Sequence, residues 1–131
     1  MASPRDPITT HVLDSTTGRP APLLMVTLML LKGGEIYQGA AFSAKTSETD
    51  GRIDIWEAIS GTANLQQLFE SHALENMEMV WILTFDTEDY WGEGRTFYPH
   101  VQIMFSVKPG DSHYHVPLLL GPWGYTTYRG S

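Results

Sequence analysis

The sequence predicts an all-β domain, a sandwich of two antiparallel sheets that carries one or two short helices. Short runs rich in β-branched and aromatic residues recur along the chain, and glycine, proline and aspartate separate them. The length of 131 residues and the apolar content of 42% suit one domain that buries its core without metals or disulfides. We therefore expect a single domain over residues 1–131.

Eight runs are predicted to be strands, and turn residues separate several of them. Gly33 and Gly34 predict a two-residue hairpin, Asp50 and Gly51 a turn, and residues 109–111 (Pro-Gly-Asp) another turn. The eight runs are residues 8–14, 23–32, 35–46, 52–56, 79–85, 101–107, 113–120 and 125–128.

Two segments have helical features instead. Leu65, Leu68 and Phe69 recur at the spacing of one helix face, which predicts a helix of about two turns over residues 64–72. The acidic stretch at residues 86–89 predicts the start of a second short helix, because carboxylates are favourable at a helix N-terminus.

The seventh run contains a proline and then becomes apolar on both faces. Pro117 has no N–H to donate, so the strand must bulge or lack a partner on one side there. The apolar residues 118–120, Trp123 and Tyr125 follow. We expect one face of this segment to pack in the core and the other against a partner chain.

Charge and composition exclude several classes of function. The formal net charge of −7 leaves no basic surface for nucleic acid. The longest apolar run, residues 23–31, is too short to span a membrane and follows acidic residues that a secretory leader would lack. Dinucleotide, Walker, nucleophile-elbow and calcium-loop motifs are absent, so we expect no cofactor. A cytoplasmic location is expected, with a peroxisomal one as the alternative.

Histidines and one arginine are the candidate chemical groups. By strand alternation, His11 shares a face with Thr9, and His113 shares a face with His115. Spacing alone favours structural or surface histidines over catalytic or metal-binding ones, since a metal would need a third ligand. Arg52 could project into a cleft, but spacing alone favours neutralisation of nearby acids.

Five stretches of the chain resemble the hydroxyisourate hydrolases of the transthyretin-related family. They are residues 10–14, 18–21, 49–52, 113–120 and the terminal Tyr-Arg-Gly-Ser at 128–131. The terminal tetrapeptide is the most specific of them, and the resemblance spans nearly the whole chain. The sequence departs from the family pattern at Gly121 and Thr126, where serines are common, and in an insertion at 61–77 that contains the first predicted helix.

The resemblance implies a transthyretin-like sandwich of two four-stranded sheets and a homotetramer, a dimer of dimers with active sites in the channel between them. It implies hydrolysis of 5-hydroxyisourate to 2-oxo-4-hydroxy-4-carboxy-5-ureidoimidazoline in urate degradation. It assigns catalysis to His11, Arg52, His115 and Ser131. Substrate binding is assigned to Arg52, Tyr128, Arg129 and Gly130, with no metal.

The expected roles follow from the chemistry of amide hydrolysis. We take His115 as the base that activates water, His11 as its proton-relaying or orienting partner, and Arg52 as the electrostatic anchor. The two histidines could exchange roles. An α-carboxylate at Ser131 could orient an imidazole, so a C-terminal tag is expected to impair activity more than an N-terminal one.

Three alternatives stay open at this stage. A transthyretin-like carrier would bind a small ligand without reacting with it, and would have no evident need for His11, Arg52 and His115 together. A zinc ion could be held by His11, His113 and His115. An interaction module of immunoglobulin type is compatible with the fold alone.

Overall fold

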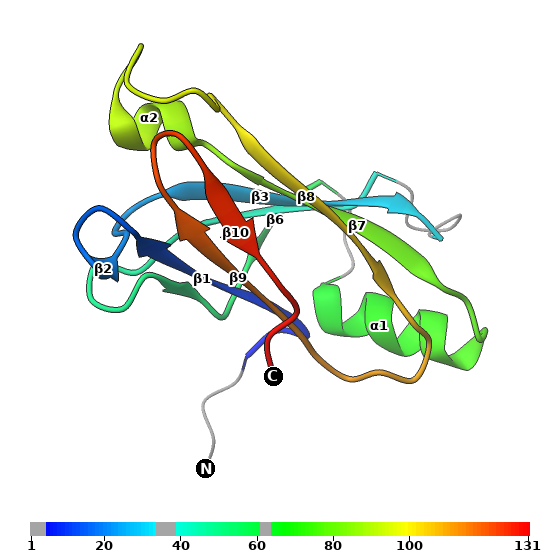
Figure 1. Cartoon of the computed structure of the whole chain (residues 1–131). Coiled ribbons are helices and arrows are strands. Elements are labelled where there is room, and N and C mark those ends of the chain that lie inside the picture. Colours follow the sequence, from blue (N-terminus) through cyan, green and yellow to red (C-terminus); the bar gives the residue numbers. More distant parts are fainter. Residues whose placement is uncertain (1–4, 34–38, 61–63) are drawn as a thin grey trace.

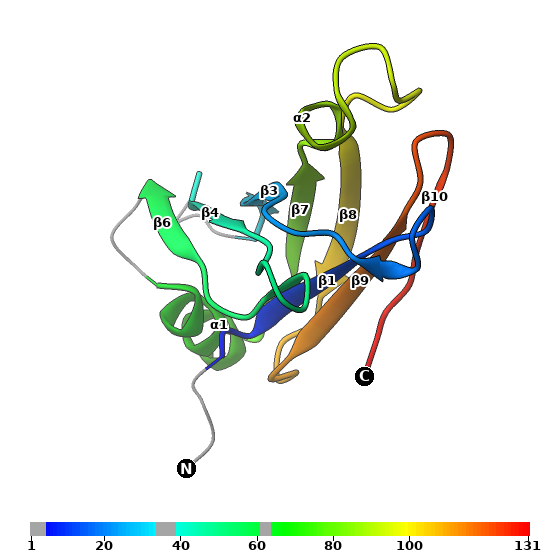
Figure 2. The same ribbon diagram turned by 90° about the vertical axis from the view of Figure 1, so that its left-hand side faces the viewer.

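The computed structural model describes residues 5–33, 39–60 and 64–131 and places their strands in two sheets. The sheets form two layers that face each other across the core (Figures 1 and 2). Apolar side chains of both sheets fill the space between the layers, with Trp81, Phe42 and Phe85 among the largest that are fully buried. The predicted β-sandwich is confirmed.

The first sheet has the order β10-β9-β1-β2, with β5 also paired to β1. Its strands are β1 (Ile8–Asp14), β2 (Arg19–Pro20), β5 (Arg52–Ile53), β9 (Tyr114–Leu120) and β10 (Tyr125–Thr127). β1 and β9 are parallel, so the expectation of purely antiparallel sheets is wrong at this pair. The two strands are about a hundred residues apart in the chain, and no hairpin turn dictates their relative direction.

The second sheet has the order β6-β4-β3-β7-β8. Its strands are β3 (Met25–Lys32), β4 (Ala41–Lys45), β6 (Glu57–Ser60), β7 (Met79–Phe85) and β8 (Val101–Val107). Each sheet therefore has five strands among the described residues, and the expected number of four is corrected. The extra strands β2 and β6 escaped prediction because β2 has only two residues and residues 57–59 of β6 are all exposed, so neither shows an apolar alternation.

The predicted strand boundaries agree best where turns lie close by. The limits of β1, β7 and β8 match the prediction. β3 starts two residues later than expected, after Leu23 with its positive φ of 55°, and β5 ends at Ile53 instead of residue 56. Residues 34–38, which include Gly34 of the expected hairpin and the start of the predicted strand 35–46, lie outside the described residues.

Both predicted helices are present, at opposite ends of the sandwich (Figure 1). α1 (Leu65–Leu74) begins with a capping box between Asn64 and Gln67, and its buried side chains join the core. α2 (Thr87–Trp91) is capped by the side chain of Asp86. Neither helix has the length or the apolar composition that a bilayer span requires. Among the described residues, the insertion at 61–77 thus contributes Leu65, Leu68 and Phe69 to the core.

Pro117 lies at a gap in the pairing of β9, as predicted. On one side it is opposite His11 of β1. On the other side the β10 ladder ends at Leu118, and the next bridge within the described residues joins His115 to Gly130. The hydroxyl of Thr127 donates to the Pro117 carbonyl at 2.8 Å across this gap. Leu118 is buried, which confirms the predicted core face of this strand.

Candidate active site

A polar cavity of about 330 Å³ lies on the first sheet. Four distant stretches of chain contribute to it. They are β1 with the residues before it, β5 with the residue after it, β9 with the residue before it, and residues 128–131. The cavity is lined by Arg5, Thr9, His11, Arg52, Asp54, His113, His115, Pro117, Tyr128, Gly130 and Ser131. This size suits a small polar molecule.

Strand pairing explains why these residues meet. The parallel register of β1 and β9 places Thr9 opposite His115. The antiparallel pairing of β1 with β5 places His11 opposite Arg52. Because side chains alternate along a strand, Thr9 and His11 project on the same face of the sheet, as the sequence predicted for this pair.

Thr9 contacts two histidines, His115 in β9 and His113 immediately before it. Its Oγ1 is 2.8 Å from Nδ1 of His115 and 3.1 Å from Nε2 of His113. Thr9 itself is buried, with 2% of its surface exposed. Sequence reasoning placed Thr9 beside His11 but did not select it as a site residue, since its partners depend on the parallel β1–β9 register.

The surroundings favour the neutral form of His115 and His113. Burial is the main cause that lowers the pKa of His115, and positive charge from Arg52, His113 and His11 adds to it, with Asp54 opposing. Burial also lowers the pKa of His113, helped by Arg5 and Arg129 and again opposed by Asp54. A neutral imidazole in the cavity has a lone pair with which to accept a proton.

The chain end runs beside His115. The Gly130 N–H donates to the His115 carbonyl at 2.7 Å, in the one isolated bridge among the described residues. This bridge keeps the antiparallel register of β10 beyond the gap at Pro117. Tyr128 and Ser131 line the cavity together with Gly130. The structure therefore brings together all the residues selected from sequence except Arg129.

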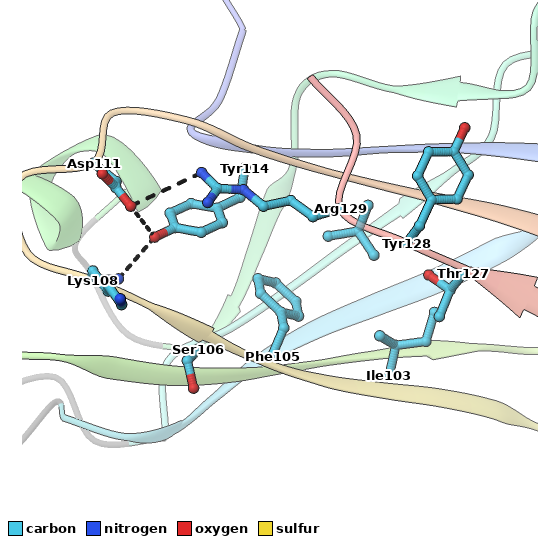
Figure 3. A pocket seen from close by; sticks show the side chains of 10 residues that line it. Ile103, Phe105, Ser106, Lys108, Asp111, Tyr114, Thr127, Tyr128 and Arg129 are labelled. Atoms are coloured by element: carbon cyan, nitrogen blue, oxygen red, sulfur yellow. Dashed lines mark hydrogen bonds and ion pairs between the residues drawn. The ribbon is translucent and has the colours of Figure 1, made fainter.

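Arg129 lies at a second cavity, of about 550 Å³, which is lined by residues of β8, β9 and β10 and of the segments that follow β8 and β10. Figure 3 shows its guanidinium extending across the ring of Tyr114 toward Asp111. The guanidinium carbon is 4.2 Å from the ring centroid, and one nitrogen is 3.9 Å from the Asp111 carboxylate. The Tyr114 hydroxyl donates to Asp111 at 2.5 Å and accepts from the Lys108 N–H at 2.9 Å. Arg129 thus holds the chain end to the sheet from the side opposite the histidines.

The described part of the chain does not meet the requirements of a metal site. No group of three or more histidine, aspartate or glutamate side chains there is arranged to hold a metal ion. The zinc alternative on His11, His113 and His115 therefore finds no support in the geometry.

Comparison with known proteins identifies relatives over the whole chain. The model of the HIUase/Transthyretin family matches residues 8–130. A mouse (Mus musculus) protein named 5-hydroxyisourate hydrolase is 37% identical, and the match covers 100% of both chains. A second relative, 5-hydroxyisourate hydrolase 2 of Rhizobium meliloti (strain 1021), is 36% identical over 95% of each chain.

Solved structures agree with this fold. The structure of Klebsiella pneumoniae 5-hydroxyisourate hydrolase superposes with a TM-score of 0.64 at 26% identity, covering 95% of this chain and 98% of that one. Transthyretin from Sparus aurata gives 0.69 at 25% identity, covering 96% and 97%. The fold alone is therefore shared by hydrolases and transthyretins, and the side chains of the cavity must distinguish them.

Proposed function

The chain belongs to the HIUase/Transthyretin family, and from this membership we propose that it hydrolyses 5-hydroxyisourate, a step of urate degradation. Relatives that match it over at least 95% of their length are named for this activity. The reaction opens a ring amide and yields 2-oxo-4-hydroxy-4-carboxy-5-ureidoimidazoline. The chain is accordingly a cyclic-amide hydrolase.

One observation carries the proposal. His11, Arg52, His115 and the final residues come from distant stretches of chain, and they line a single polar cavity. A transthyretin-like carrier of a small apolar ligand would gain nothing from two imidazoles and a guanidinium there. Polar groups that converge in a cavity, with the pKa of His115 lowered by burial, are typical of an active site.

Water activation is the role that best suits His115. Its Nδ1 is engaged by Thr9, which leaves Nε2 as the other ring nitrogen. In the proposed step, Nε2 takes a proton from water as the water oxygen attacks the ring carbonyl carbon. The carbon–nitrogen bond then breaks, and His11 relays to the departing nitrogen the proton that His115 took from water. The two histidines could exchange these roles.

Arg52 supplies a fixed positive charge at the cavity. Its guanidinium stays protonated and offers several donors in one plane, which suits a carbonyl oxygen that gains negative charge. Its position opposite His11 in the β1–β5 pair places it on the same side of the sheet as the proposed base. Ser131 and Tyr128 border the same space and are proposed to contact the substrate.

We also propose the homotetramer that the family resemblance implies, with a second copy closing the cavity. Exposed apolar side chains support this. Leu119 follows His115 and Pro117 on the same strand face and is 37% exposed, and Trp123 is 69% exposed. A Leu119→Glu variant tests the assembly, because a charge in an apolar interface should shift the mass measured by light scattering toward smaller species.

The activity is tested with freshly generated 5-hydroxyisourate and its ultraviolet absorbance. Decay without protein is subtracted, because the compound also hydrolyses spontaneously. The chain should accelerate the decay, and His115→Asn and His11→Asn should each lose roughly a hundredfold or more in rate. Absence of acceleration by the native chain would refute the function, whereas native turnover in one variant would remove that histidine from the chemistry.

A further inference from the structure

We propose that Thr9 is a positioning residue that sets the proton arrangement of His113 and His115, so that Nε2 of His115 presents a lone pair to the cavity. This inference rests on the proposed function for its catalytic meaning. The geometry that supports it belongs to the free chain.

The contacts are specific and partly buried. One hydroxyl lies within hydrogen-bond distance of two histidine nitrogens, Nδ1 of His115 at 2.8 Å and Nε2 of His113 at 3.1 Å. The backbone fixes the closer pair, since Thr9 and His115 are opposite residues of the parallel β1–β9 ladder. Thr9 is only 2% exposed, so little water competes for these bonds.

The proton count of a hydroxyl restricts the arrangement. Thr9 has one proton to donate, so no more than one of the two histidines can accept from it. If Thr9 donates to Nε2 of His113, its oxygen accepts the proton on Nδ1 of His115. A neutral His115 with its proton on Nδ1 has a bare Nε2, which is the form that a general base needs.

Charges around the pair favour this direction over the reverse. Arg52 on β5 faces His115, and its positive charge favours a lone pair over an N–H on the cavity side. His11 on β1 and His113 also lower the pKa of His115, while Asp54, which follows β5, raises it. Burial lowers the pKa of His113, and the positive charges of Arg5 and Arg129 lower it further. Burial, aided by these positive charges and opposed by Asp54, lowers the pKa of both rings, which favours the neutral form in which a tautomer has meaning.

The same strand offers a matched control. Thr10 is also buried and its hydroxyl donates to the Val116 carbonyl at 2.6 Å, but it lies on the core face away from the cavity. Thr9→Val removes the hydroxyl without changing the shape of the side chain, Thr9→Ser keeps the hydroxyl, and Thr10→Val removes a comparable buried hydrogen bond. A purely structural effect would appear equally in Thr9→Val and Thr10→Val.

The experiment measures the tautomer of His115 by NMR and the pH dependence of kcat/KM. Nitrogen-15 NMR of the native chain should show His115 protonated on Nδ1, and Thr9→Val should lose this preference. Thr9→Val should lose roughly ten- to a hundredfold in kcat/KM and change the apparent pKa of the acidic limb, whereas Thr9→Ser and Thr10→Val should keep the native profile.

The NMR measurement needs no substrate, so it separates this inference from the proposed function. An Nε2-protonated His115 in the native chain would overturn the inference, even if Thr9→Val failed to fold. So would a Thr9→Val variant with the native tautomer and pH profile. An inactive native chain that still shows the predicted tautomers would refute the hydrolase function and leave the role of Thr9 in orienting the rings intact.

Discussion

The backbone of Gly130 lies directly against the ring of His115. A side-chain carbon added at Gly130 would be 2.7 Å from Cδ2 of His115 and 3.2 Å from Cγ of Pro117. Glycine is needed here for space, since its φ lies outside the left-handed region that favours glycine elsewhere. The chain end therefore packs on the proposed base and limits how its ring can turn.

Gly130→Ala is expected to damage activity far more than stability. The added methyl must push the chain end or the His115 ring away, and misplacement of about 1 Å can cost roughly a hundredfold in rate. Gly124→Ala is the matched control, because nothing lies within 4 Å of a carbon added there. Rates are compared in the absorbance assay and Tm by thermal unfolding. Equal rates for the two variants would show that the contact is unimportant.

Arg52→Gln is expected to shift the pH profile as well as lower the rate. After burial, Arg52 is the next cause that keeps the pKa of His115 below its ordinary value of 6.5. With that charge removed, the pKa rises, so the acidic limb of kcat/KM should move to higher pH. Arg19→Gln alters an exposed arginine of β2 that does not line the cavity, and should leave the limb in place. An unmoved limb in Arg52→Gln would contradict the assigned electrostatics.

Arg129→Gln and Asp111→Asn should both lower activity if Arg129 positions the chain end, and Arg129→Gln should lower it more. The stacking on Tyr114 and the partly exposed ion pair with Asp111 are each worth up to about 1 kcal/mol. Asp111→Asn removes only the ion pair and should lose up to about fivefold in kcat/KM, whereas Arg129→Gln removes both interactions and should lose up to about thirtyfold. Glu93→Gln, an exposed loop substitution, serves as the control. If Arg129 instead contacted the substrate and did not need Asp111, Asp111→Asn would keep full activity while Arg129→Gln lost it.

Asp14→Asn should weaken the fold at neutral pH and lose that effect in acid. Burial alone would raise the pKa of Asp14, but hydrogen bonds from Thr16, Tyr90 and the backbone outweigh it and lower the pKa below its ordinary 3.8. Such a carboxylate stabilises the fold above about pH 3.8, and the stabilisation disappears as pH falls through the lowered value.

Denaturant unfolding from pH 7 to about pH 2 tests this prediction. The free energy of unfolding of Asp14→Asn should approach that of the native chain at the acidic end. Tyr90→Phe keeps the packed ring and removes one of the hydrogen bonds, so it should show a smaller gap with the same pH trend. A constant difference across the range would show that the carboxylate charge does not matter.

The elements of the fold were largely predictable from local sequence. The limits of β1, β7 and β8 follow from runs rich in β-branched, aromatic and other apolar residues that end at turns or caps. The capping residues Asn64 and Asp86 begin the two helices where local spacing and charge indicated. The common face of His113 and His115 also follows from alternation alone. These features depend on sterics and hydrogen bonds within a few residues, which a sequence displays directly.

The partners within the site were decided by the tertiary structure. Only the parallel pairing of β1 with β9 makes Thr9 a neighbour of His115, and this pairing joins segments about a hundred residues apart. Likewise, Tyr114 and Asp111 hold the Arg129 guanidinium on the other side of the sheet. The residues next to it in sequence, Tyr128 and Gly130, line the cavity with the histidines. The pairing of strands and its direction depend on how the whole core packs. They cannot be predicted from the local alternation of apolar and polar residues.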